Sequence, residues 1–75
     1  MRQHLVCDYD ITEVQRAREI LTECGWIPLI ALESTEHWVY DGHRIILSWD
    51  DNESCPVLEF ARIESVGEHF IVVPY

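Results

Sequence analysis

Lysine is absent from this chain, and its five basic residues, all arginines, are outnumbered by fourteen Asp and Glu residues. The formal net charge is −9 over 75 residues. Affinity for nucleic acid phosphates comes from clustered Lys and Arg that displace counterions, so this composition disfavours direct binding to DNA or RNA. It favours a basic protein as the partner. The charge is uneven, because residues 1–25 carry three Arg and five acids whereas residues 26–75 carry two Arg and nine acids.

Several other sequence signals are also missing. No run approaches the roughly 18 apolar residues of a membrane span, and no basic segment followed by an apolar one opens the chain. The three cysteines form no C-x-x-C pair, which fits a reducing cytosol. We therefore expect a cytoplasmic protein with no membrane contact, located in the host cytosol if a phage encodes it.

The length and composition predict a single compact domain over residues 1–75. The chain is 48% hydrophobic, which is enough for a packed core. A core this small leaves little room for a substrate pocket, since ligand sites usually need about 300 Å³ or more. We therefore expect no enzymatic activity.

The clearest local pattern is the stretch from Trp38 to Ser54, which contains a hairpin signal. Asp41-Gly42 separates two runs of aromatic and β-branched residues, and Asp-Gly favours a two-residue type I′ turn. This turn fixes the register of the two strands. The expected cross-strand pairs are Tyr40 with His43, Val39 with Arg44, and Trp38 with Ile45.

A helix is predicted over residues 11–24. Asp10 is a suitable N-cap with Glu13 three positions later, and Gly25 followed by Trp26 is typical of a Schellman ending. Apolar residues recur at helical spacing and form one stripe, which consists of Ile11, Val14, Ala17, Ile20, Leu21 and Cys24.

The remaining segments read as short strands joined by turns. They cover residues 3–8, 27–32, 37–40, 43–49, 57–64 and 69–73. The apolar run 27–32 predicts a strand buried on both faces or lying under the helix, with Pro28 at an edge, a strand start or a bulge.

The predicted fold class is α+β, a single domain with a mostly antiparallel sheet of about four to six strands. The element order is strand, helix, then four or five strands, and the helix packs on one face. One helix cannot cover a five-stranded sheet, so the uncovered face should be partly polar. An aromatic side chain left on that face would mark an interaction site.

The densest acidic cluster directly follows the hairpin. We predict a partner-binding surface in which aromatic anchors are rimmed by acids. The alternative is that the acids belong to an ordinary solvated loop and that the aromatic side chains belong to the core. The residues assigned to this surface are Glu33, Glu36, Trp38, Tyr40, Asp41, Trp49, Asp50, Asp51 and Glu53.

No cofactor, metal or catalytic residue is predicted. The oxygen-rich segment 50–53 lacks the spacing and glycine of an EF-hand calcium loop. Zinc ligands drawn from His4, Cys7, Cys24 and the other His and Cys residues lack paired short spacings, so buried structural thiols are favoured. Asp8 and Asp10 resemble a carboxylate pair, but capping and the helix dipole explain them. No serine lies in a nucleophile elbow.

In size, charge and compactness the chain resembles phage-encoded counter-defence inhibitors such as anti-CRISPR proteins, and also toxin-neutralising immunity proteins. The resemblance implies a small acidic inhibitor that mimics nucleic acid and blocks a positively charged, nucleic-acid-handling protein. It assigns no residue roles. The alternative is a homo-oligomeric structural or regulatory module, in which an exposed sheet edge, such as residues 69–73, pairs with its symmetry mate.

Overall fold

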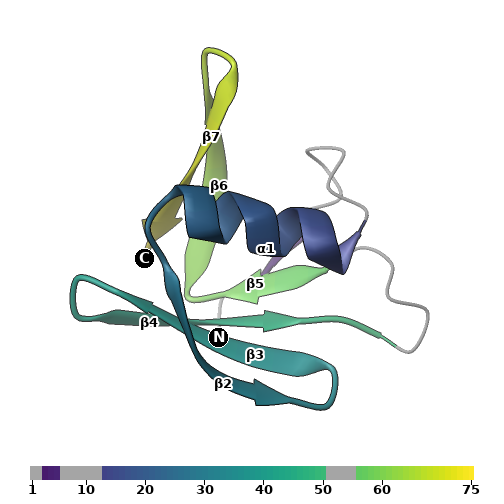
Figure 1. The fold of residues 1–75 in the computed structure, drawn as a ribbon. Helices are drawn as coiled ribbons and strands as arrows, with labels where there is room; N and C mark the ends of the chain where they lie inside the picture. The colour runs from purple at the N-terminus through teal and green to yellow at the C-terminus, as the bar shows by residue number, and fades with distance from the viewer. Residues whose placement is uncertain (1–2, 6–12, 51–55) are drawn as a thin grey trace.

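The computed structural model describes residues 3–5, 13–50 and 56–75, with side chains described from residue 13 onward. It confirms the α+β fold class (Figure 1). One helix and seven strands follow in the order β1 (Gln3–Leu5), α1 (Val14–Glu23), β2 (Ile27–Leu32), β3 (Thr35–Tyr40), β4 (His43–Ser48), β5 (Val57–Glu59), β6 (Ala61–Val66) and β7 (His69–Pro74).

The strands form two antiparallel sheets. The larger sheet has five strands in the order β1-β5-β4-β3-β2, and β6 and β7 form a separate two-stranded sheet. The helix α1 crosses one face of the larger sheet, and the β6–β7 hairpin rises beside it (Figure 1). Within the described part of the chain, no helix covers the opposite face of the larger sheet (Figure 1). Among the described residues, no helix is long and apolar enough to cross a membrane.

The predicted hairpin register is confirmed. Tyr40 pairs with His43, Val39 with Arg44, and Trp38 with Ile45. Asp41 and Gly42 have φ angles of 48° and 78°, as a type I′ turn requires. Side chains alternate across the strands, so one row faces α1 and joins the core. This row consists of Glu36, Trp38, Ile45, Leu47 and Leu58.

The helix is confirmed, but it begins at Val14 rather than near residue 11. Glu13 is the N-cap and makes no side-chain capping bond, while Asp10 lies outside the described residues. The C-terminal end matches the predicted Schellman motif, since Trp26 N–H donates to the Leu21 carbonyl and Gly25 N–H to the Thr22 carbonyl. This ending turns the chain sharply from α1 into β2.

Replacing Gly25 with Ala should cost more stability than replacing Gly67 with Ala. Both glycines have positive φ angles, which costs an L-residue about 1–2 kcal/mol. A Cβ on Gly25 would also lie 3.1 Å from Cε2 of Tyr40, whereas one on Gly67 would meet open space. We expect G25A to lose about 1 kcal/mol more than G67A in urea unfolding. Equal losses would mean that the Tyr40 ring moves aside freely.

The prediction that residues 27–32 are buried is wrong. β2 is the outermost strand of the sheet, and all six of its residues are exposed. The apolar run therefore reflects neither burial on two faces nor contact with the helix. The prediction for Pro28 is confirmed, because it lies in an edge strand where the register shifts between Pro28 and Ile30.

The predicted strand 57–64 is divided in two at Phe60. Phe60 has a φ of 71°, which ends β5 and redirects the chain into β6. This left-handed residue resets the side-chain alternation, so Leu58, Ala61 and Ile63 are all buried. The Phe60 side chain is 43% exposed. A regular strand would have put Leu58 and Phe60 on the same face.

Candidate functional site

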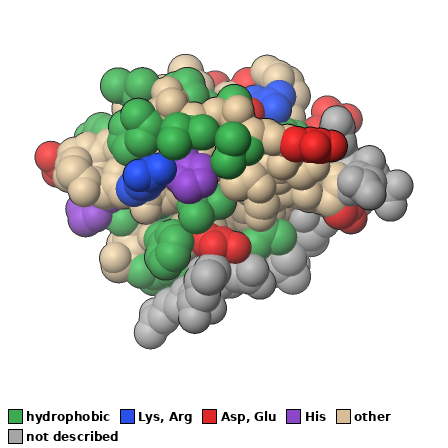
Figure 2. Space-filling model, turned by 90° about the horizontal axis from the view of Figure 1, so that it is seen from below, with side chains coloured by type: hydrophobic (Ala, Val, Ile, Leu, Met, Phe, Trp, Pro, Cys, Tyr) green, Lys and Arg blue, Asp and Glu red, His purple; other side chains and the backbone are tan. Residues whose placement is uncertain are grey.

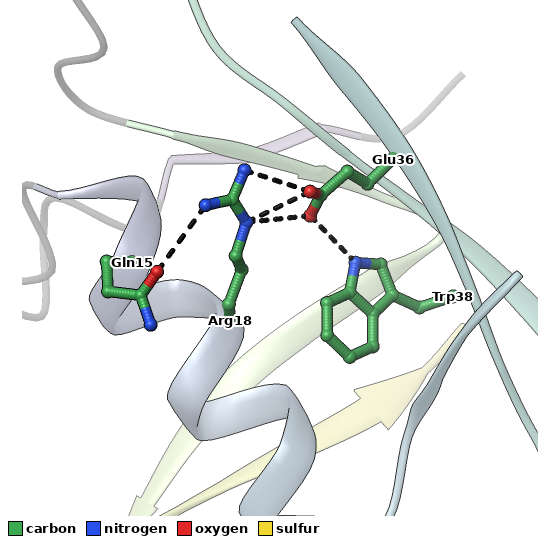
Figure 3. A network of polar contacts seen from close by, with 4 residues as sticks. All are labelled: Gln15, Arg18, Glu36 and Trp38. Atoms are coloured by element: carbon green, nitrogen blue, oxygen red, sulfur yellow. Dashed lines mark hydrogen bonds and ion pairs between the residues drawn. The ribbon is translucent and has the colours of Figure 1, made fainter. Parts of the chain in front are cut away.

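Two residues of the predicted partner-binding surface lie inside the protein. Glu36 is 8% exposed and Trp38 is 4% exposed. Both point from β3 toward α1, where Arg18 and Trp38 each donate a hydrogen bond to the Glu36 carboxylate (Figure 3). Their assignment to a free surface is therefore corrected, because each is already engaged within the core.

Glu36 forms the centre of a polar network between helix and sheet. Arg18 Nε donates to both carboxylate oxygens at 3.2 and 2.9 Å, and Arg18 NH2 lies 2.9 Å from Oε2. Trp38 Nε1 donates to Oε1 at 3.2 Å, and Arg18 NH1 bonds to Gln15 (Figure 3). A buried carboxylate needs such partners, since an unpaired charge is costly away from water. The network thus fixes the position of α1 relative to β3.

The other described residues of the prediction fall at two separate ends of the hairpin. Glu33 and Asp50 lie near one end, where Trp49 N–H donates to the Ser34 carbonyl. Trp49 is half-buried and stacks under Arg18, with Cζ 5.3 Å from the ring centroid. Asp51 and Glu53 lie outside the described residues.

Asp41 and Tyr40 lie at the opposite end of the hairpin. The six residues of β3 separate them from Glu33 by roughly 20 Å. Tyr40 is 48% exposed, and its ring centroid lies 5.4 Å from that of Trp26. The described acids therefore form no single cluster, and partner binding by them stays a prediction.

The sheet face away from α1, here called the open face, carries a group that the sequence did not single out. Its members follow from the strand register and from the pocket that Phe60 lines. They are Ile27, Ile30, Leu32, Thr35, His37, Val39, Arg44, Ile46, Ser48, Val57, Glu59 and Phe60. Ile27 and Leu32 are 63% and 59% exposed. Hydrophobic side chains spread across this face, with Arg, His and acidic side chains among them (Figure 2).

A shallow pocket of about 270 Å³ lies within the open face. His37, Arg44, Ile46 and Phe60 line it. Arg44 Nε donates to His37 Nδ1 at 3.1 Å, which holds the guanidinium over the sheet. The other described arginines each pair with a carboxylate, namely Arg16 with Glu19, Arg18 with Glu36 and Arg62 with Glu64.

A larger pocket, of about 430 Å³, lies between the end of α1 and β7. Cys24 lines it together with Tyr40, His69 and Phe70. The Cys24 thiol donates to the Phe70 carbonyl at 3.3 Å, and burial raises its pKa, an effect that a backbone hydrogen bond from Val72 partly offsets. A raised pKa lowers the thiolate fraction at neutral pH, so this thiol is a poor nucleophile and metal ligand. Within the described residues, no three His, Cys, Asp or Glu side chains group as a metal site.

Two sequence signals could have indicated the open face. The segment 27–32 has no charge in a chain that is 25% charged, and it contains a proline. The lack of charge fits a buried strand equally well, whereas the proline favours an edge strand, because it has no N–H to donate to a second neighbouring strand. Comparison of the chain with protein-family models, curated proteins and solved structures finds no match. Function is therefore argued from the geometry of the chain itself.

Proposed function

We propose that this chain is a protein-binding module whose partner docks on the open face. The observation that carries the proposal is the apolar surface around Ile46 and Phe60, over which no described helix lies (Figure 1), with Arg44 beside it. Aromatic and Arg side chains around a small apolar pocket are typical of binding hot spots. A contiguous patch of exposed apolar side chains often marks an interaction site on a protein.

The partner is expected to carry a positive surface around an apolar centre. Glu33 and Asp41 are exposed at the two ends of the hairpin, and the whole chain carries a net charge of −9. Such a potential speeds the approach of a basic protein, whereas the apolar contacts determine how long it stays bound. Two physically different parts of the surface would thus control association and dissociation.

In its finer form, the proposal is a cytoplasmic inhibitor that blocks a nucleic-acid-handling protein by occupying its basic cleft. Net charge supports this form, because a cleft that binds phosphates also attracts carboxylates. The module itself binds no nucleic acid or membrane and catalyses no reaction in this proposal. An immunity protein that neutralises a basic toxin would use the same surface.

A pull-down from bacterial lysate with matched variants tests the proposal. I46T/F60N removes the apolar anchors while keeping a β-branched residue in β4 and a residue that tolerates positive φ at position 60. I71T is the control, because Ile71 is 38% exposed on the other sheet. E33Q/D41N removes charge, and Asn suits the type I′ turn.

We expect wild type and I71T to capture the same protein, and I46T/F60N to bind it at least ~10-fold more weakly. E33Q/D41N should bind more slowly at low salt and show a flatter salt dependence. Capture that survives I46T/F60N but fails with I71T would contradict the proposal, since the partner would then bind the β6–β7 hairpin.

A further inference from the structure

β2 is an edge strand with unusually little protection. Natural edge strands are commonly blunted by Lys, by inward-pointing charges, by Pro or by bulges. All six residues of β2 are exposed and none is charged. Its two protective features, Pro28 and the register shift before Ile30, both lie in the first half of the strand. The second half, Ile30–Leu32, is open for pairing.

The hairpin register determines which backbone groups face that open edge. In the type I′ hairpin, Tyr40 and His43 form the hydrogen-bonded closing pair, so Trp38 and Glu36 also turn their backbone groups toward β4. His37 and Thr35 turn theirs toward β2, where they pair with Ile30 and Leu32. Ala31, opposite Glu36, therefore directs its N–H and C=O away from the sheet.

We propose that a second copy of this chain pairs with β2 across a two-fold axis at Ala31. The two Ala31 residues exchange both of their backbone hydrogen bonds in an antiparallel pair. Ile30 of each copy then lies opposite Leu32 of the other copy, on the open face. The two five-stranded sheets join into one continuous sheet with both helices on the same side.

The geometry of this edge favours a second copy as its occupant. Glu33, the first charged residue after β2, would lie opposite Leu29 of the other copy, so no like charges face each other in the ladder. Repulsion between the two negatively charged copies acts over longer distances and is screened beyond about 8 Å at physiological salt. Pro28 falls beyond the last ladder pair, so its missing N–H is not needed.

The β6–β7 sheet offers a poorer edge for self-pairing. β7 lies against the end of α1, and the Phe70 carbonyl accepts a hydrogen bond from Cys24. This contact occupies part of the edge that residues 69–73 were expected to use. Self-association through β2 does not require the proposed partner. It would place the open faces of the two copies side by side.

The expected dimer is of modest affinity. We expect an interface built on one short strand pair to fall in the class of small, weak interfaces, below about 1,200 Å², with a dissociation constant in the micromolar range. Sedimentation equilibrium from about 5 to about 500 µM would span that range. Higher salt should leave the dimer intact or strengthen it, because screening reduces repulsion between the copies.

Three variants make the test specific. A31P removes the outward N–H, and Pro is tolerated where an edge N–H faces solvent. L32K replaces an apolar contact with a charge and leaves the backbone unchanged. I71K makes the same type of change at an exposed position of β7. Far-UV circular dichroism confirms the fold of each variant.

We expect wild type and I71K to dimerise as concentration rises, and A31P and L32K to bind at least ~10-fold more weakly. If A31P fails to fold, L32K decides the outcome. A wild-type protein that stays monomeric over the whole range would overturn the proposal and leave β2 open for a strand of another protein. A dimer that persists in L32K but is lost in I71K would also overturn it.

Discussion

Replacing Leu21 with Ala is expected to destabilise the protein by about 2–5 kcal/mol. Leu21 is 1% exposed and lies on the face of α1 that packs into the core. Ala is the best helix former, so the loss reflects packing and the cavity rather than helix propensity. At 0.05–0.15 kcal/mol per residue, a domain of this size has about 4–11 kcal/mol in total. Urea unfolding followed by tryptophan fluorescence measures the change.

The matched control for this prediction is Val66→Ala. Val66 is 54% exposed at the tip of β6, so V66A should change stability by less than about 1 kcal/mol. An L21A protein that is as stable as V66A would show that α1 does not pack with this face inward.

Removing Arg18 is expected to cost more than removing Arg18 and Glu36 together. R18M leaves the buried Glu36 carboxylate with Trp38 as its remaining hydrogen-bond partner in the network. We expect a loss of about 2–4 kcal/mol, somewhat less than for a fully buried pair because the Arg18 side chain is 37% exposed. The double variant R18M/E36Q removes the stranded charge, keeps an oxygen acceptor for Trp38 Nε1 and should recover at least ~1 kcal/mol of this loss.

A double-mutant cycle in urea separates these effects. R16M is the control, because Arg16 pairs with Glu19 on the exposed surface of the same helix, where a salt bridge contributes little. If R18M/E36Q were less stable than R18M, the stranded charge would not be the main cost of R18M, and the charge argument would be wrong.

The features that the sequence predicted well are specified locally. The Asp41-Gly42 turn forces its hairpin because two successive positive φ angles leave few alternatives. Gly25 ends the helix for the same kind of reason. The start of the helix was less predictable, because its N-cap residue, Glu13, makes no side-chain capping bond and is not a typical capping residue.

The features that the sequence did not predict depend on tertiary context. An uncharged run such as 27–32 fits either a buried central strand or an exposed edge, and strand order decides between them. In the sequence Glu36 has the context of a surface acid, but in the structure Arg18, eighteen positions earlier, pairs with it. Phe60 adopts a left-handed conformation without being Gly, Asn or Asp, so no local signal marked the break.

The same reasoning explains why the proposed binding surface differs from the one predicted from the sequence. The acidic cluster and the nearby aromatics were adjacent in sequence, but strand alternation turns Trp38 inward and the hairpin separates Asp41 from Asp50. The open face instead combines residues from β2, β3, β4, β5 and the β5–β6 junction. Such a surface is assembled by sheet order, which short-range patterns do not encode.

The most direct test of the central claim is methyl NMR of the isotope-labelled protein with and without the captured partner. If the open face is the docking surface, the Ile46 and Ile27 methyl signals should shift or broaden on binding, whereas that of Ile71 on the other sheet should not. Perturbation of Ile71 with unchanged Ile46 and Ile27 signals would contradict the account.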